Sequence, residues 1–485
     1  MAKWEPTEED IERVVSEQNP WLVTGIVPAT LAPSTERALA RSLWARVARD
    51  EPTRYQLILG PRRVGKTTAM YQTVRHFLDS GISPTRLWWF RLDHPLLLQS
   101  NLQQLVTVSL DIAGPPNEPT YFFFDELVYA RDWDLWLKTF YDERYPIRII
   151  ATSSATAALR GRRLESGVGR WDEQFLMPYT FTEFLDLAGR DAKVDVKQDL
   201  ASTIEHALEQ RVSFELERER QSFLFIGGFP ELLVQEDVEG RDPASLLLES
   251  QRILRSDAVE RAIYKDIPQS YGVENPLALE RLLYSLAGQA PGLISPKRIC
   301  GELDISQPTF DRYLSYLERA FLVFTLPNYS GREATVQKRG RKLYFVDGAV
   351  RNAALQRGVA PLKNPAELGL LLENLIASNL RALAVQSAVR LFHWRDGKHE
   401  VDLVFDHPDR PLAFEVSSSP DHSRKGLIEF ARRFPKFAQG CYVIAPSVQG
   451  VPPKKSRSDV GTIPVDLFLV LAGRQAERAL AERLA

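Results

Sequence analysis

The stretch LILGPRRVGKTT, residues 57–68, constrains the fold more than any other part of the sequence. An apolar run ends at Gly60, and Gly65-Lys66-Thr67-Thr68 follows after four intervening residues. Glycines let a backbone curl until successive amides point at one phosphate, and the following helix adds its positive end. Lys66 would reach the β- and γ-phosphates, and Thr67 would hold Mg²⁺. The spacing predicts a strand–loop–helix that binds ATP and Mg²⁺ through these five residues.

A second stretch, YFFFDEL at residues 121–127, supplies two carboxylates directly after a run of aromatic residues. Acidic side chains at the end of a buried strand are costly unless they meet a metal ion or water. We expect Asp125 to stabilise the Mg²⁺ shell and Glu126 to polarise an attacking water, which favours hydrolysis over binding alone. A simple acidic turn is the alternative.

Two further stretches carry candidates for the same chemistry. The run IRIIATSS ends in Thr152, Ser153 and Ser154, and Ser153 at a strand tip could position water against the γ-phosphate. Helix capping by Ser153 or Ser154 is an open alternative. Arg170 follows two glycines in SGVGRWDEQ, and an arginine from the same or a neighbouring subunit can stabilise charge on a transferred phosphate. A surface arginine is the competing interpretation.

Length and composition limit the remaining possibilities. A chain of 485 residues exceeds one core, so two to four domains are expected. The formal net charge of −2 indicates no global field for a polyanion, so that any nucleic-acid surface must be local. Two cysteines without metal-ligand spacing favour a reducing compartment. The acidic start MAKWEPTEED lacks the features of a signal peptide, and we expect a cytoplasmic protein without a membrane span.

The order of apolar runs predicts an α/β fold. Residues 55–190 alternate short apolar runs with helical patterns, as in βα units with a parallel sheet: YQLILG, RLWWFRL, TYFFFDE and PIRIIATSS. Residues 1–54 and 191–265 read as helical. Strand-like runs return after residue 341: KLYFVD, VRLFHW, EVDLVFD, PLAFEV and GCYVIAP.

Taken in order, five stretches resemble a prokaryotic family of AAA+-type ATPases fused to a C-terminal domain of unknown function. They are GPRRVGKTT, FFFDEL with DWDLWLKTFYD, ATSSA through SGVGR, MPYTFTEFL and IGGFPELL. The resemblance runs from about residue 20 to about residue 450. It implies that Arg62 and Arg63 of the loop matter and strengthens Arg170 as an arginine finger. Solubility of the loop is the alternative explanation for the arginine pair.

The resemblance also implies the domain layout. It consists of an ASCE-type P-loop ATPase core, a helical lid, a winged helix and a nuclease-like C-terminal fold. We therefore expect an N-terminal helical segment at 1–54, the core at 55–190, the lid at 191–265, the winged helix at 266–340 and the nuclease-like domain at 341–485.

A helix-turn-helix rhythm appears within LISPKRICGELDISQPTFDRYLSYLERAF. Ser306 is a candidate N-cap with Pro308 in the first turn of the second helix. That helix could enter a DNA groove and present Gln307, Thr309, Arg312 and Tyr313. A protein-packing role is the alternative, because Phe310, Leu314, Leu317, Ala320 and Phe321 form an apolar stripe at helical spacing.

Basic clusters gather in the C-terminal half of this nearly neutral chain. The first contains Lys338, Arg339, Arg341 and Lys342, and further clusters lie in SRK at 423–425, ARRFPK and PPKKSR. Basic residues on polar faces are usually solvated charge. Their number modestly favours a surface for the phosphate backbone of DNA.

Three carboxylates near the C-terminus could gather Mg²⁺ for phosphodiester cleavage: Glu373 on an apolar helix and Asp402 and Glu415 on strands. Their arrangement resembles the PD-(D/E)XK nuclease fold, which includes archaeal Holliday-junction resolvases. That fold has Glu-x-Lys at its third motif, whereas this chain has Glu415-Val416-Ser417. Lys425 on the next helix is a weaker substitute. We therefore expect a degenerate nuclease-like domain that binds DNA without cutting it.

These observations together predict an ATP-hydrolysing homo-oligomer that binds branched DNA such as a Holliday junction. The substrate rests on analogy between folds. Two alternatives stay open: an active ATP-dependent nuclease, and a switch ATPase whose C-terminal modules bind a protein partner.

Overall fold

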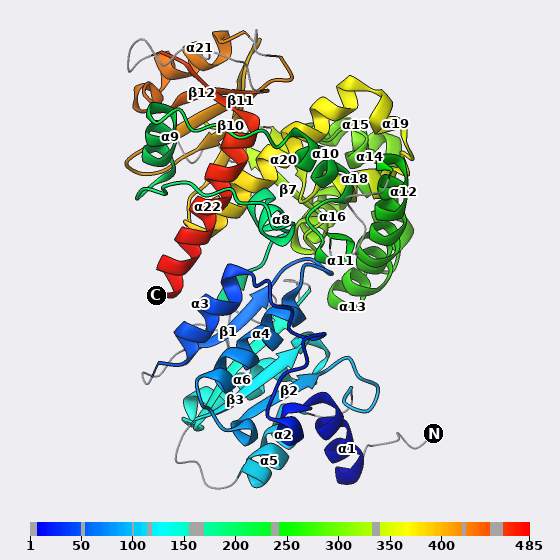
Figure 1. Cartoon of the computed structure of the whole chain (residues 1–485). Helices are drawn as coiled ribbons and strands as arrows, with labels where there is room; N and C mark the ends of the chain where they lie inside the picture. Colours follow the sequence, from blue (N-terminus) through cyan, green and yellow to red (C-terminus); the bar gives the residue numbers. More distant parts are fainter. Residues whose placement is uncertain are drawn as a thin grey trace. The chain divides into compact units, whose positions relative to one another are not determined.

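A computed structural model of the chain describes residues 7–49, 54–98, 101–113, 119–154, 169–233, 242–331, 340–419, 423–446 and 459–485. The chain divides into two compact units (Figure 1). The first comprises Met1–Leu176, Gln269–Gly272 and Leu484–Ala485, and the second comprises Met177–Pro268 and Val273–Arg483. The predicted boundaries at residues 190, 265 and 340 do not coincide with this division.

The first unit is built on a five-stranded parallel sheet with the order β2-β3-β4-β1-β5. Its strands are β1 Tyr55–Leu59, β2 Leu87–Arg91, β3 Thr120–Asp125, β4 Ile147–Ser153 and β5 Trp171–Phe175. Nearly every residue of β1 to β4 is buried, as expected of a parallel sheet covered on both faces. The predicted parallel α/β core is confirmed, and β5 is an additional edge strand.

The helices of the first unit are α1 Glu8–Gln18, α2 Trp21–Thr24, α3 Ala38–Val47, α4 Lys66–Asp79, α5 Leu102–Ala113 and α6 Trp133–Asp142, with short 3₁₀ turns η1 Pro84–Arg86 and η2 Leu127–Tyr129. Asn19, buried at the end of α1, exchanges hydrogen bonds with the backbone of Trp89 in β2, at 2.6 and 2.9 Å. The N-terminal helices are therefore part of the sheet unit and not a separate segment.

The second unit begins with helices: α8 Phe181–Leu187, α9 Leu200–Glu209, α10 Glu217–Ile226, α11 Pro230–Leu233, α12 Pro243–Leu254, the π-helical turns η3 Arg255–Glu260 and η4 Ala262–Asp266, then α13 Ile267–Tyr271, part of which belongs to the first unit, and α14 Pro276–Ala287. Two of the motifs noted in the sequence, MPYTFTEFL and IGGFPELL, meet here. The amide of Tyr179 donates to the carbonyl of Gly228 at 2.7 Å, and the amide of Gly228 donates to Asp347 at 2.7 Å.

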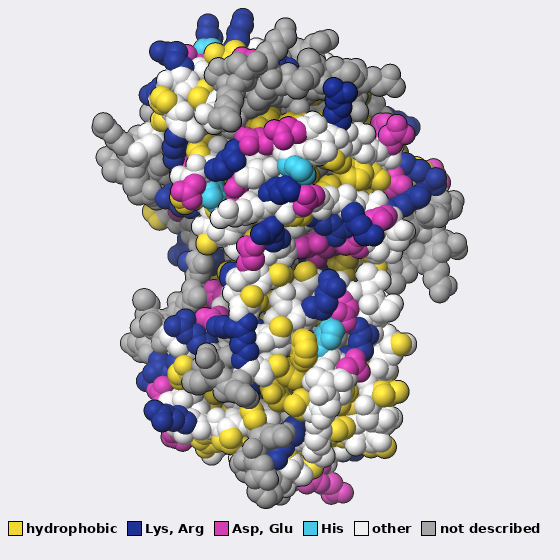
Figure 2. Space-filling view, turned by 60° about the vertical axis from the view of Figure 1, so that its left-hand side comes forward, with side chains coloured by type: hydrophobic (Ala, Val, Ile, Leu, Met, Phe, Trp, Pro, Cys, Tyr) yellow, Lys and Arg dark blue, Asp and Glu magenta, His cyan; other side chains and the backbone are white. Residues whose placement is uncertain are grey.

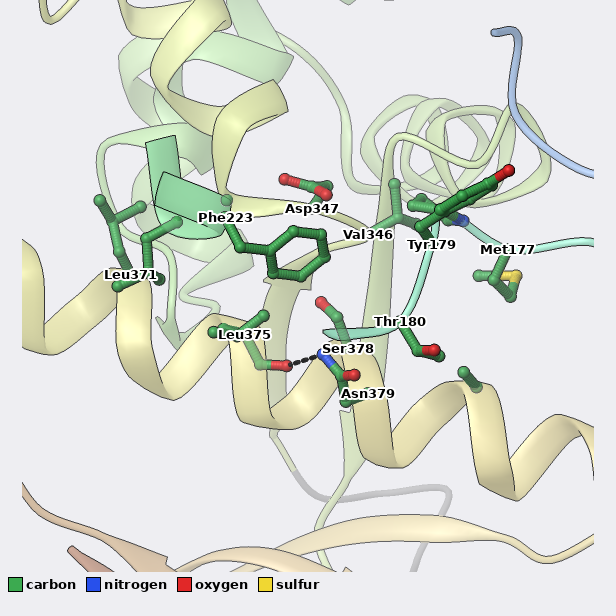
Figure 3. Close-up of a pocket in the computed structure, with 14 residues that line it drawn as sticks. Met177, Tyr179, Thr180, Phe223, Val346, Asp347, Leu371, Leu375, Ser378 and Asn379 are labelled. Carbon is green, nitrogen blue, oxygen red and sulfur yellow. Dashed lines mark hydrogen bonds between the residues drawn. The ribbon is translucent and has the colours of Figure 1, made fainter. Parts of the chain in front are cut away.

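Figure 3 shows the small cavity of about 20 Å³ beside this junction, lined by Tyr179, Asp347, Asn379 and mostly apolar neighbours. Burial raises the pKa of Asp347, while the amides of Gly228 and Ala349 oppose that rise. Asn379 accepts a hydrogen bond from the amide of Phe181 at 3.0 Å. The two motifs therefore hold the start of the second unit against its central helix.

A small antiparallel sheet follows, with the order β6-β8-β7. Its elements are β6 Gly292–Leu293, α15 Pro296–Leu303, α16 Gln307–Arg319, β7 Val323–Pro327 and β8 Arg341–Phe345. The hydroxyl of Ser306 accepts from the amide of Thr309 at 3.3 Å, which confirms the predicted N-cap. The predicted apolar stripe of α16 is buried.

The last part of the second unit is a five-stranded mixed sheet, β13-β12-β11-β10-β9. Strands β9 to β11 are antiparallel and β11 to β13 parallel. Its elements are α18 Gly348–Leu355, α19 Ala360–Lys363, α20 Pro365–Gln386, β9 Leu391–Asp396, β10 His399–Phe405, β11 Leu412–Val416, α21 Lys425–Arg433, the turn η5 Pro435–Phe437, β12 Cys441–Ala445, β13 Gly461–Pro464 and α22 Val465–Leu484.

Helix α20 is long and apolar enough to cross a membrane by length and composition alone, the one such helix among the described residues. In the structure 61% of its most apolar window is buried inside the protein. Asn374 in its middle exchanges hydrogen bonds with the backbone of Phe345 at 2.9 and 3.0 Å. This is the environment of a core helix.

Candidate functional site

The phosphate loop lies between β1 and α4, where the sequence predicts it. Gly65 has φ = +86° and precedes the first turn of α4, a conformation that a side chain disfavours. A Cβ at Gly60 would stand 2.0 Å from the carbonyl oxygen of Leu176, the residue that follows β5. Both glycines are therefore required by the backbone itself.

Lys66 is buried in the first turn of α4 and turns back over the loop. Its ammonium donates to the carbonyls of Gly60 at 3.0 Å and Pro61 at 2.8 Å. Arg37, which the sequence did not single out, is also buried and donates to the carbonyl of Val64 at 3.0 Å. No local motif marks Arg37, because its contact depends on how α3 packs beside α4.

The side chains named for the metal shell lie together. Strand β4 separates β1 from β3, so that the carboxyl ends of all three meet at one edge of the sheet. Asp125, the last residue of β3, accepts hydrogen bonds from Thr67 at 2.8 Å and Thr152 at 2.5 Å. Burial and the charge of Glu126 raise the pKa of Asp125 to about 6. A carboxylate beside a loop hydroxyl fits Mg²⁺, which prefers oxygen ligands.

Glu126 has left-handed backbone geometry, with φ = 56°, which is uncommon for a residue with a side chain. Its carboxylate accepts hydrogen bonds from the hydroxyl of Ser154 at 3.1 Å and the amide of Ser154 at 3.3 Å. Arg62 stands 4.0 Å from the same carboxylate. From the end of β4, Thr152 and Ser154 thus contact the acid pair, in addition to Thr67 and Arg62 from the phosphate loop and the start of α4.

The other loop residues differ in exposure. Arg63 is exposed and has φ = 66°, and Thr68 is half-buried in the first turn of α4. Arg62 is largely buried, with 14% of its side chain exposed. Of the arginine pair, Arg62 is therefore the one that faces the acid pair.

Arg170 does not reach the phosphate loop of its own chain. Its carbonyl accepts a hydrogen bond from the amide of Tyr55, so it lies at the amino end of β1, opposite the loop. Its guanidinium forms two hydrogen bonds of 2.8 Å with Asp142 at the end of α6 and lowers the pKa of that carboxyl. A role as an arginine finger within one chain is excluded by this geometry, and a role toward a neighbouring copy stays a prediction.

In the second unit two of the three predicted carboxylates, Glu373 and Asp402, lie against the ammonium of Lys342, and the third, Glu415, lines the same cavity. Lys342 was predicted to contact DNA, but its side chain is only 5% exposed. Its ammonium lies 2.9 Å from Glu373, 3.1 Å from Glu400 and 2.6 Å from Asp402. The prediction for Lys342 is wrong because alternation along β8 turns this side chain inward. We call Lys342, Glu373, Glu400, Asp402 and Glu415 the lysine cluster.

The electrostatics of the lysine cluster follow from its burial. Burial alone would lower the pKa of Lys342, but Tyr344, Asp402, Glu373 and Glu400 hold that pKa well above its ordinary value. Burial and the charge of Asp402 raise the pKa of Glu415 to about 8. Burial and Asp402 also raise the pKa of Glu373.

Ser417 and Lys425 flank this cluster. The hydroxyl of Ser417 donates to the carbonyl of Ser419 at 2.6 Å. Lys425 begins α21, is exposed, and helps to line an open cavity of about 670 Å³ over the cluster. The sequence suggested that serine at position 417 leaves the carboxylates without a cation. In the structure Lys342 provides that cation instead.

The residues predicted to contact DNA are spread over two elements. Gln307, Thr309 and Arg312 are on α16, and Arg341 is exposed at the start of β8. Tyr313 is buried. Lys338 and Arg339 lie outside the described residues, as does PPKKSR.

Several other basic side chains are matched by local acids. Arg432 pairs with Glu429, Arg433 with Asp396 and Lys436 with Asp406. Figure 2 shows basic and acidic side chains interspersed on the face that it presents. The ARRFPK cluster is therefore largely neutralised.

Comparison with known families places these features. The model of a family described as AAA domain matches residues 53–185, the segment that holds the phosphate loop and the acid pair. The first unit is an AAA-type ATPase domain. Two models described as domains of unknown function, DUF8612 and DUF4143, match residues 217–360 and 368–464 in the second unit. The lysine cluster draws on both segments, because Lys342 lies in the first and its carboxylates in the second.

Relatives share much of the chain. An uncharacterized protein of Methanocaldococcus jannaschii is 28% identical over 377 residues, which cover 74% of each chain. One from Haemophilus influenzae is 22% identical over 410 residues, 82% of this chain and 91% of its own. Among solved structures, a RuvB variant of Thermotoga maritima covers 60% of this chain and 87% of its own at 18% identity, with a TM-score of 0.28. Cdc6p from Pyrobaculum aerophilum covers 69% of this chain and 99% of its own at 13% identity, with a TM-score of 0.25. Scores this low do not establish a shared overall fold.

Proposed function

We propose that the AAA-type ATPase domain hydrolyses ATP with Mg²⁺ and that the second unit binds DNA, with a preference for branched forms such as Holliday junctions. The observation that supports hydrolysis is the position of Glu126. Its carboxylate is oriented by Ser154 beside the loop, where it can accept a proton from water as the water oxygen attacks the γ-phosphorus. The bond to the bridging oxygen breaks, and ADP and phosphate leave.

The other residues of the site bind and orient. Loop amides and Lys66 would hold the phosphates, while Thr67 and Asp125 would hold Mg²⁺, which supplies positive charge to the phosphate oxygens. Thr152 fixes the acid pair, since its hydroxyl donates to Asp125 and accepts from the amide of Glu126 at 2.9 Å. Arg170 would complete the site of a neighbouring copy, which makes a cytoplasmic homo-oligomer the working form.

DNA binding is supported by the order of elements in the second unit. Helices α14, α15 and α16 with the β6-β8-β7 sheet follow the sequence of helices and strands found in a winged helix. Helix α20 and the β9 to β12 strands with α21 follow that of PD-(D/E)XK proteins. Both folds commonly contact nucleic acid. The analogy is between folds, and the residues that carry it are Gln307, Thr309, Arg312 and Arg341.

Fluorescence anisotropy on labelled junction, fork, duplex and single-stranded DNA at low and moderate salt tests the proposal. We expect the junction to bind best, with affinity that falls steeply as salt rises, because cations on phosphate are released. Reversal of charge at Arg312 and Arg341 should weaken binding. Arg432→Glu is the matched control, since Arg432 is exposed but paired with Glu429. No binding to any DNA would favour the switch ATPase.

One observation favours the nuclease alternative. Lys342 places a cation beside Asp402, which Ser417 cannot do because its side chain is neutral. Incubation of labelled junctions with Mg²⁺ or Mn²⁺ decides between them: cleavage that is lost in Asp402→Ala would establish an active nuclease.

A further inference from the structure

We propose that Lys342 is a built-in counter-ion that takes the place of a divalent metal in the lysine cluster, so that the carboxylates of this cluster bind no metal ion. The inference goes beyond the proposed function, because it holds whether or not the second unit binds DNA. It commits the site to one occupant, the ammonium of the chain's own lysine.

The distances fit an ammonium ion. The three carboxylate oxygens around Lys342 stand 2.6 to 3.1 Å from its nitrogen. Charge-assisted hydrogen bonds have about this length, so the ammonium fits among these oxygens. The ammonium donates hydrogen bonds to Glu400 and Asp402 and forms an ion pair with Glu373. Among the residues that the structure describes, no three His, Cys, Asp or Glu side chains are arranged to hold a metal ion.

The backbone fixes the lysine in this position. Strand β8 is the middle strand of its sheet, and Lys342 pairs with Leu293 of β6 on one side and Leu326 of β7 on the other. Tyr344 lies two residues on, on the same face, and its hydroxyl donates to Glu373 at 2.9 Å. The cation is therefore held by two strand ladders and is not a side chain that happens to lie near acids.

The carboxylates are fixed as well. The second oxygen of Asp402 accepts from the amide of Val416 at 2.9 Å. Glu373 accepts a hydrogen bond from the hydroxyl of Tyr344. A divalent ion that entered the cavity above the cluster would compete with the ammonium for the same carboxylate oxygens. Exposed cations at the mouth of the cavity, Arg395, Lys398 and Lys425, oppose its approach.

Titration of the full-length, nucleotide-free chain with Mn²⁺, followed by the electron paramagnetic resonance signal of the free ion, tests this. The wild type and Asp402→Asn should bind the same amount of Mn²⁺. Lys342→Met should gain a site, because three carboxylates lose their counter-ion, and Lys342→Met/Asp402→Asn should lose it again. Lys398→Met, at the rim of the same cavity, is the matched control and should gain nothing. Wild-type binding that Asp402→Asn removes, or a folded Lys342→Met without a new site, would overturn the proposal.

A second measurement covers the case in which Lys342→Met fails to fold. Reductive methylation of the wild type, read by peptide mass spectrometry, should modify Lys398 and Lys425 quickly and leave Lys342 protected, because its nitrogen is enclosed by carboxylates. Addition of Mn²⁺ should not change the rate at Lys342. Rapid labelling of Lys342, or labelling accelerated by Mn²⁺, would show that a metal can displace it.

Discussion

The acid pair of the ATPase domain and the lysine cluster of the second unit are both groups of partly or fully buried carboxylates, but different donors hold them. Asp125 and Glu126 are held by hydroxyls and an amide, from Thr67, Thr152 and Ser154. In the lysine cluster, Glu373 and Asp402 contact a buried ammonium directly.

The difference explains what each site can accept. A hydroxyl orients a carboxylate but leaves its charge in place, so Asp125 still needs a cation from outside. An ammonium orients and neutralises at once. The first site is therefore suited to Mg²⁺ and a substrate, whereas the second has already satisfied its need for positive charge.

The largest expected effect is in the nucleotide site of the ATPase domain. Lys66→Ala should abolish ATP binding, and Glu126→Gln should keep binding but reduce turnover by about 10²–10⁴, the usual contribution of a general base. Nucleotide titration and phosphate release on both variants measure this. Glu143→Gln, an exposed acid in the same unit, is the control. Full hydrolysis by Glu126→Gln would place the base elsewhere.

In the lysine cluster, removal of the lysine should lower the stability of the fold. Lys342→Met leaves partly buried carboxylates facing one another without a cation, which should lower the free energy of unfolding by up to about 3–5 kcal/mol. Urea denaturation measures the loss. The double variant Lys342→Met/Asp402→Asn should recover part of it, because one buried charge is removed. A single variant as stable as the wild type would make the cation dispensable.

Substitution of Arg170 tests whether the nucleotide site also receives a positive charge from a neighbouring copy of the chain. Arg170→Ala should lower kcat by at least about a hundredfold with little change in nucleotide affinity. The wild-type rate per chain should rise with protein concentration. Asp142→Ala, which removes the partner of Arg170, should leave kcat closer to the wild type. A normal kcat in Arg170→Ala would leave it as a surface ion pair.

The two sites should respond to pH over different windows. A carboxyl whose pKa is raised by folding keeps a proton that the unfolded chain releases, so stability falls as pH rises between the two pKa values. For Asp125 this fall should end near pH 6, and for Glu415 near pH 8. Each amounts to a loss on the order of a few kcal/mol. Hydrogen exchange at β3 and β11 across pH should show it. Asp125→Asn should remove the pH dependence of stability that ends near pH 6, and Glu415→Gln should remove the one that ends near pH 8. Neither variant should change the other dependence.

The smallest expected effect separates neighbours on β4. Thr152→Val removes a hydroxyl that bonds both Asp125 and the amide of Glu126, at a cost of about 1–3 kcal/mol in unfolding free energy. Ser153→Ala should cost less and leave phosphate release nearer the wild type. Thermal unfolding and turnover of both variants decide. A larger loss in Ser153→Ala would restore Ser153 as the residue that positions water.

Local patterns in the sequence were enough to predict the phosphate loop, the acid pair and the parallel sheet. Each depends on residues within one strand, one turn or one helix start. Strand β5 escaped notice because WDEQF is half polar, as suits an edge strand. The contacts of Thr152 and Ser154 with the acid pair could not be predicted, because they depend on which face of β4 meets β3. The role of Ser153 in positioning water stays a prediction.

Only part of the lysine cluster could be predicted from the sequence. Glu373, Asp402 and Glu415 could be named from their elements, but the basic run around Lys342 reads as solvated charge in sequence. Only the pairing of β8 with β6 and β7 turns that lysine toward α20 and β10. Contacts of this kind depend on the tertiary arrangement of distant segments, as does the contact of Arg37 with Val64.

The close approach of Leu176 to Gly60 has a mechanical consequence. The amide of Leu176 donates to the carbonyl of Leu59 at 2.8 Å, and its own carbonyl fills the space beside Gly60. The phosphate loop and the end of β5 are therefore in backbone contact within the first unit. A shift of Gly60 toward β5 would press on the carbonyl of Leu176, so that the loop and this edge strand have to move together.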